Sequence, residues 1–135
     1  MTNMYGTVDE FKKFIGKPTD SIDPPNATIA DGLYIARGMI DEVIGTDDAF
    51  VDVSTGNLSK NVEMACYMTV ADWLNIRLGI DEARKNQNFG AMTSLMTILS
   101  SYTISGIARS LILRAYGNVR DSEVLASSEE SYCRV

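Results

Sequence analysis

A chain of 135 residues with 45% hydrophobic and 22% charged residues has the composition of one folded globular domain, which excludes a disordered chain and two independent domains. Its formal net charge of -6 and pI near 4.5 argue against tight wrapping around nucleic acid, because such binding depends on Lys and Arg that displace counterions from phosphates. The absence of histidine excludes Ser-His-Asp and Cys-His catalytic arrangements and histidine-metal sites from this chain.

The first predicted helix lies in the segment TVDEFKKFIG, from Thr7 to Gly16. Thr7 and Glu10 have the spacing of a capping box, and Gly16 supplies a left-handed stop. The apolar face consists of Val8, Phe11 and Ile15, with Lys12 and Lys13 toward the other side. Because so short a helix is unstable alone in water, we expect it to be held by packing against another element.

The next segment, KPTDSIDPPN, is predicted to be a loop, because its prolines remove backbone donors and favour extended geometry. Thr28 is the expected cap of a second helix that ends at Gly45. Its apolar stripe consists of Ile29, Leu33, Ala36, Ile40 and Val43. Gly32 and Gly38 lie inside this helix, where each costs about 1 kcal/mol relative to Ala. We therefore expect another backbone to approach them, and Gly38 is a candidate protein-interface residue.

The segment TDDAFVDVSTGN is predicted to be a solvated loop with a short strand at Phe50 to Val53. A third helix is expected from Ser59 or Asn57 to Gly79. It is apolar on several sides, which is typical of a central, buried helix, and we expect Trp73 in the main core and Cys66 as a buried thiol.

The segment IDEARKNQNFG is predicted to be a polar connector before a fourth helical region from Ala91 to Tyr116, broken near Tyr102 and Thr103. The core candidates of this region are Leu95, Leu99, Tyr102, Ile107, Leu111 and Leu113. The stretch from Asn86 to Ala108 carries no charge, yet about half of it is polar or glycine, so we do not expect a membrane helix.

The predicted fold is all-α, a small bundle of about four helices with an extended C-terminal tail. Residues 1–117 form the expected helical domain and residues 118–135 the polar tail. The tail carries Val124, Leu125 and Tyr132 as apolar residues in polar surroundings, a pattern typical of segments that fold on binding. These three are further candidate protein-interface residues.

No stretch has a catalytic pattern. The neighbouring carboxylates are interpreted as solvated faces: Asp41 and Glu42, Asp47 and Asp48, Asp81 and Glu82, and Glu129 and Glu130. There is no phosphate-binding loop and no dinucleotide fingerprint. We therefore predict no enzymatic activity, no cofactor and no metal site. No secretory signal precedes the first helix, so the chain is expected to begin at or near Met1.

The order and pattern of these helices resemble the head-tail connector (adaptor, or head-completion) proteins of tailed phages and related viruses. The resemblance lies in TVDEFKKFIG followed by TIADGLYIARGMIDEVIG, and VEMACYMTVADWLNIRLG fits the long helix that follows in such proteins. It covers residues 7–79 and extends loosely over the rest. A longer Pro-Pro loop and the uncharged Ser/Thr-rich stretch before Arg109 depart from the usual pattern. Because of these departures, the resemblance does not indicate to which ring of the neck the chain would belong.

The resemblance implies a structural virion protein at the head-tail interface, assembled in the host cytoplasm. It implies a homo-oligomeric ring, dodecameric in this family, docked beneath the portal protein. Such a ring would extend the DNA channel, through which DNA passes without specific binding, and would provide the platform for the next neck or tail-completion protein.

Two other hypotheses rest on the uncharged stretch from Asn86 to Ala108. One is a small intracellular helical adaptor or regulator that binds one protein partner through this stretch. The other is a membrane-active protein. Portal, terminase and capsid genes beside this one would favour the connector hypothesis.

Overall fold

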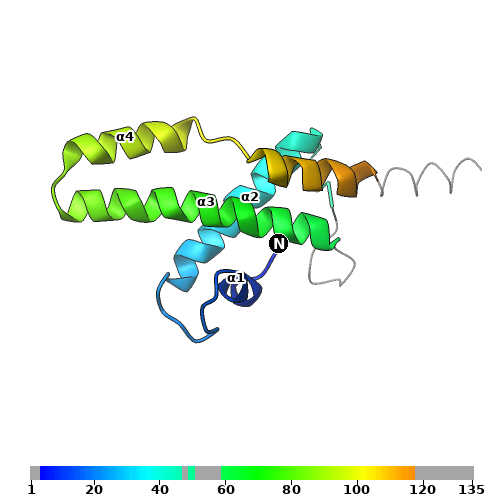
Figure 1. Ribbon diagram of the computed structural model, residues 1–135, viewed down its shortest axis with the longest axis horizontal. Coiled ribbons are helices and arrows are strands. Elements are labelled where there is room, and N and C mark those ends of the chain that lie inside the picture. The colour runs from blue at the N-terminus through cyan, green and yellow to red at the C-terminus, as the bar shows by residue number, and fades with distance from the viewer. Residues whose placement is uncertain (1–3, 47–48, 51–58, 118–135) are drawn as a thin grey trace, which may run out of the picture.

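The computed structural model describes residues 4–46, 49–50 and 59–117 (Figure 1). Within these residues, every regular element is helical: α1 (Val8–Phe14), α2 (Asn26–Ile44), α3 (Lys60–Lys85), α4 (Phe89–Ser100) and a further helix over residues 106–117. The all-α prediction is confirmed for this part of the chain. The tail, with Val124, Leu125 and Tyr132, lies outside the described residues, as does the part of the expected strand beyond Phe50.

The long helix α3 is the central element of the fold (Figure 1), and both α2 and α4 pack against it. Trp73 and Cys66 are buried on α3, as predicted. Ser59 caps the helix by accepting a 3.2 Å hydrogen bond from the Asn61 N–H. The helix continues past Gly79 to Lys85, so the prediction of a polar connector from Ile80 to Lys85 is wrong.

Helix α3 continues because its last turns are covered on one side. Ile80 and Ala83 are buried, outside the main core cluster. A Cβ at Gly79 would lie 3.1 Å from Leu95 Cδ1, which shows how closely α3 and α4 approach each other. The charged residues of the segment IDEARK suggested a connector, but they form the outer face of this packed helix.

Helix α2 begins at Asn26, directly after Pro25, and not after the predicted cap Thr28. Pro25 is the N-cap, with the extended angles φ -62° and ψ 143°, and no side-chain hydrogen bond caps this end of the helix. The predicted end at Gly45 is confirmed: the residue is left-handed with φ 86°, and its N–H donates a 2.7 Å hydrogen bond to the Asp41 carbonyl.

The two glycines within α2 differ in their surroundings. A Cβ at Gly32 would lie 2.9 Å from Val70 Cγ1 and 3.1 Å from Trp73 Cε3, so this glycine permits the close approach of α3. No heavy atom lies within 4 Å of the corresponding position at Gly38, which is exposed. The close contact expected within the chain is therefore present at Gly32, and Gly38 remains a prediction for an interface between chains.

Helix α1 has the predicted cap and stop, but the position of Lys12 was predicted wrongly. Lys12 is only 1% exposed, and its Nζ donates hydrogen bonds to the Thr19 carbonyl at 3.0 Å and the Ser21 carbonyl at 2.8 Å. The loop after α1 folds back over the lysine and satisfies its ammonium group with backbone oxygens. Lys12 thus fastens α1 to the loop that leads to α2.

The last helical region is broken at residues 101–105, as predicted, which gives one more helix than the expected four. The core residues after the break are Ala108, Ile112 and Ala115, whereas the predicted core residues Ile107 and Leu113 are exposed. The break resets the helical phase, so the face expected from one continuous helix is not the face that turns to the core. Leu95 and Leu99 are half-buried, and α4 has no fully buried residue.

The second half of α3 and the antiparallel α4 extend together beyond α1 and α2 (Figure 1). We call residues 77–100 the arm. At its tip, Gln87 adopts a left-handed φ of 55°, and Asn88 Oδ1 accepts a 3.2 Å hydrogen bond from the Ala91 N–H to begin α4. The arm therefore exposes the outer side of α4 over the whole length of that helix.

Candidate functional site

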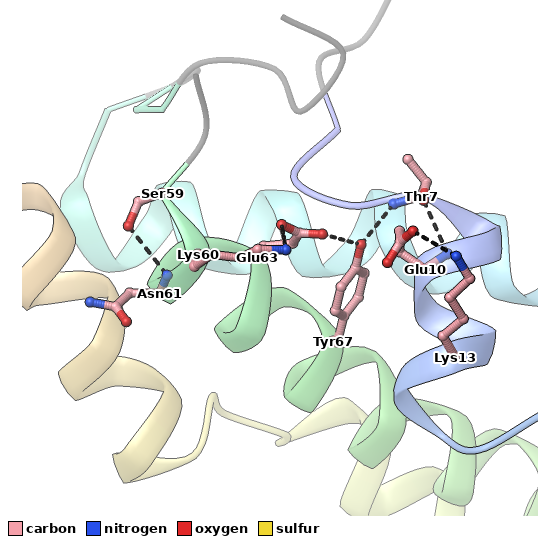
Figure 2. Close-up of polar contacts among 8 residues, drawn as sticks. All are labelled: Thr7, Glu10, Lys13, Ser59, Lys60, Asn61, Glu63 and Tyr67. Atoms are coloured by element: carbon pink, nitrogen blue, oxygen red, sulfur yellow. Dashed lines mark hydrogen bonds and ion pairs between the residues drawn. The ribbon is translucent and has the colours of Figure 1, made fainter. Parts of the chain in front are cut away.

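A shallow groove of about 280 Å³ lies between α1 and the first turns of α3 (Figure 2), and we call it the α1–α3 groove. Its lining combines apolar and charged side chains: Glu10, Lys13 and Phe14 from α1, and Lys60, Glu63, Met64 and Tyr67 from α3. The groove lies between the first turns of the two helices whose starts were predicted from the capping residues Thr7 and Ser59.

Tyr67 connects the start of α1 to α3 (Figure 2). Its hydroxyl accepts a 3.2 Å hydrogen bond from the Thr7 N–H and donates a 2.9 Å hydrogen bond to Glu63 Oε1. Glu63 Oε2 in turn lies 3.3 Å from Lys60 Nζ. The Tyr67 phenol is protonated at neutral pH and can donate, and burial raises its pKa further above the ordinary value of 10.0.

The capping box predicted at α1 is only half formed. Thr7 Oγ1 accepts a 3.2 Å hydrogen bond from the Glu10 N–H, as expected. The Thr7 N–H, however, donates to Tyr67, while Glu10 Oε1 lies 3.2 Å from Lys13 Nζ. A contact over 60 residues of sequence replaces the local one, because Tyr67 of the adjacent α3 lies within reach of that donor.

The floor of the groove is aromatic and thioether surface. The Tyr67 ring packs against Phe11 at 6.1 Å and Phe14 at 5.8 Å between centroids, and Phe14 and Met64 remain partly exposed. The acidic groups of the groove are paired with neighbouring lysines. This arrangement can accept an apolar side chain of a partner above paired charges, but it offers no activated nucleophile or acid–base pair.

A second polar network lies inside the fold, around Asp41. The Tyr5 hydroxyl donates a 2.5 Å hydrogen bond to Asp41 Oδ1, which also accepts from the Ala49 N–H at 3.2 Å. Arg37 Nε lies 3.6 Å from Asp41 Oδ2. The Phe50 N–H donates to the Tyr5 hydroxyl at 3.2 Å.

The network corrects the interpretation of Asp41 as part of a solvated face, since the residue is 4% exposed. Its partners come from the N-terminal segment and from the residues after α2, so the carboxylate holds both segments on α2. Burial, followed by the hydrogen bond to Asp41, raises the pKa of the Tyr5 phenol. The one sequence signal for this network was the i, i+4 spacing of Arg37 and Asp41 on one helix.

The outer face of α4 is an uncharged surface of the arm. Its exposed apolar residues are Phe89 at 61%, Met96 at 49% and Ile98 at 50% exposure. Thr93 and Thr97, which lie between them, donate their hydroxyl hydrogen bonds back to the Phe89 and Thr93 carbonyls at 2.8 and 3.0 Å. The hydroxyls of Thr93 and Thr97 are therefore satisfied within α4, which lowers the cost of removing water from them.

Of the predicted interface residues, the structure describes only Gly38, on the exposed side of α2. Sequence reasoning missed Tyr5, Lys12, Asp41, Glu63 and Tyr67, whose polar groups are buried or bound across the fold. In the described residues, no cluster of three or more acidic or cysteine side chains is arranged to hold a metal ion. None of the helices found there has the length and hydropathy of a bilayer span.

Comparisons of the chain with protein-family models, with curated proteins and with solved structures find no match.

Proposed function

We propose that this chain is a structural protein of the viral head-tail neck, which forms a homo-oligomeric ring beneath the portal protein. The observation that carries the proposal is the arm: a two-helix extension whose outer helix, α4, has no buried residue and no charge. A surface of this kind is typical of a subunit that is completed by its neighbours in an assembly.

The rest of the fold supports a structural role. The buried polar groups around Asp41 and Lys12 fix loops and the N-terminal segment to the helices, and the groups at the α1–α3 groove pair with one another. These networks make a rigid subunit that presents surfaces. The net charge of -6 suits a channel through which DNA slides, because carboxylates repel phosphates.

In this proposal the ring, dodecameric in the resembled family, extends the DNA channel below the portal. The α1–α3 groove, with its apolar floor and paired charges, is suited to an exposed side chain of the portal or of the next neck protein. The tail residues Val124, Leu125 and Tyr132 are the proposed contacts to that next component.

The test is assembly of the purified full chain with the portal protein encoded in the same genome. Native mass spectrometry and negative-stain electron microscopy should detect rings of this chain stacked on the portal ring. A chain that neither binds the portal nor is required for DNA-filled heads to accept tails would contradict the proposal.

The second candidate is a small helical adaptor that binds one protein partner through residues 86–108. The same exposed α4 face supports it, because a 12-residue uncharged helix with exposed apolar side chains can lie along a single partner helix. A monomeric chain that captures one partner in a one-to-one complex, with no ring on the portal, would favour the adaptor.

A further inference from the structure

The outer face of α4 combines properties that rarely occur together on a fully solvated helix. Phe89, Met96 and Ile98 are each about half exposed or more. Between them lie Thr93 and Thr97, which present methyl groups because their hydroxyls bond to carbonyls of their own helix. The face therefore has Phe89 and Met96 at one edge and Ile98 at the other, with an uncharged central strip that includes the exposed Ser94.

Charge identifies which occupant suits this face. The chain has a net charge of -6, so two copies repel each other over most of their surfaces. From Asn86 to Ala108 there is no charged residue, so a second copy can approach this face without meeting a like charge on it. A partner selected by charge complementarity would instead be expected to meet carboxylates or ammonium groups, and the face contains none.

The size of the face adds a second constraint. Helix α4 has 12 residues, a length of about 18 Å, so one side of it falls short of the roughly 800 Å² per partner that a stable interface buries. The helix of residues 106–117 lies on the same side of α3 as α4 (Figure 1) and exposes Ile107 and Leu113. It also exposes Arg109 and Arg114, which can pair with carboxylates of a second copy whose net charge is -6. A contact that runs along both helices can reach the required area.

From these observations we infer that the outer face of α4 is covered by a second copy of this chain, with the contact extending over the exposed side of residues 106–117. The inference rests on the proposed ring and deepens it, because it names the surface through which neighbouring subunits meet. The face of α4 is then the apolar centre of the subunit interface, where charged residues are normally depleted.

The test is the variant Thr97→Glu, which places a carboxylate at the centre of the face. The side chain is exposed, so the variant should keep the helical circular dichroism and the Trp73 fluorescence of the parent. Sedimentation velocity over a concentration series should show the parent associating and the variant dissociating. The expected increase in the subunit dissociation constant is about 100-fold or more, because the charge would be buried without a partner.

Two further variants serve as controls. Thr97→Val keeps the shape of the side chain and should associate as the parent does. Ala27→Glu adds the same charge at an exposed position in the first turn of α2, where the helix dipole favours it, and should leave association unchanged. If Thr97→Glu itself loses helicity, Met96→Lys at the edge of the face repeats the test.

The outcomes separate this inference from the proposed function. A folded Thr97→Glu variant that still forms the parent oligomer would overturn the α4 contact while leaving the ring in place. A parent chain that remains monomeric and binds the portal protein through α4 would also overturn it, because the occupant would then be a different protein. A parent chain that neither associates nor binds the portal would remove both.

Discussion

The phenol of Tyr5 and the carboxylate of Asp41 form a 2.5 Å hydrogen bond between residues 36 positions apart in the sequence. The contact is buried, and the same Asp41 oxygen accepts the Ala49 N–H. One acidic side chain thereby fixes the N-terminal segment and the residues after α2 to the same helix. The stability of the fold should be unusually sensitive to this pair.

Replacing Tyr5 with Phe should lower the free energy of unfolding by about 1–3 kcal/mol, because Asp41 would lose a donor in a site that water does not reach. The ring itself would remain, with its edge-to-face contact to Phe50 at 5.7 Å between centroids. Urea denaturation followed by circular dichroism measures the change. Tyr34→Phe on the exposed side of α2 is the matched control, and equal losses for the two variants would contradict the role given to Asp41.

Ala substitutions at the two glycines of α2 should have opposite effects. Gly32→Ala should destabilise the chain by about 1–3 kcal/mol, because the new methyl would overlap Val70 and crowd Trp73. Gly38→Ala should stabilise the monomer by up to about 1 kcal/mol through helix propensity, since nothing lies near its Cβ position. Thermal and urea unfolding of both variants checks the pair.

The interface prediction at Gly38 has its own measurement. Gly38→Leu should leave the monomer folded, because the position is open, and should weaken assembly if another subunit packs there. Unchanged helicity together with unchanged ring formation would remove Gly38 from the interface.

Replacing Lys12 with Met should destabilise the fold by about 1–3 kcal/mol, because the Thr19 and Ser21 carbonyls would lose a charged donor. Lys13→Met on the same helix is the control: its ion pair with Glu10 is largely exposed and should contribute less than about 1 kcal/mol. Native-state hydrogen exchange of the loop before α2 should quicken in the first variant only. Comparable effects in both would mean that Lys12 does not hold the loop.

Cys66 should make stability depend on pH in alkaline solution. Burial, followed by the charge of Glu63, raises the pKa of the Cys66 thiol from 9.0 to about 12. The folded state therefore keeps a proton that the unfolded chain loses, so this contribution is fully present below about pH 9 and is lost as pH rises toward 12. Urea unfolding between about pH 8 and pH 10 should show a decline that Cys66→Ala reduces.

A chemical measurement complements the pH series. The sequence has one other cysteine, Cys133. In a Cys133→Ser background, a thiol reagent should modify Cys66 slowly in buffer and rapidly in denaturant. Rapid modification of the folded chain would contradict the buried position.

Several local features of the chain were determined by the sequence alone. Thr7 and Ser59 begin α1 and α3, Gly16 and Gly45 are left-handed at the ends of α1 and α2, and the last helical region breaks close to Tyr102. These features depend on backbone donors, acceptors and dihedral angles within one turn, so neighbouring residues suffice to specify them. The burial of Trp73 was also predictable, because α3 is apolar on several sides.

Only the tertiary structure decided which polar and small residues lie inside. Lys12 and Asp41 have the sequence pattern of solvated residues, yet backbone carbonyls and a distant tyrosine satisfy them in the interior. Gly32 and Gly38 have the same intrinsic propensity, but α3 crosses α2 at the first and not at the second. The free energy of burying such groups depends on partners from other elements, and no local pattern records where those partners will be.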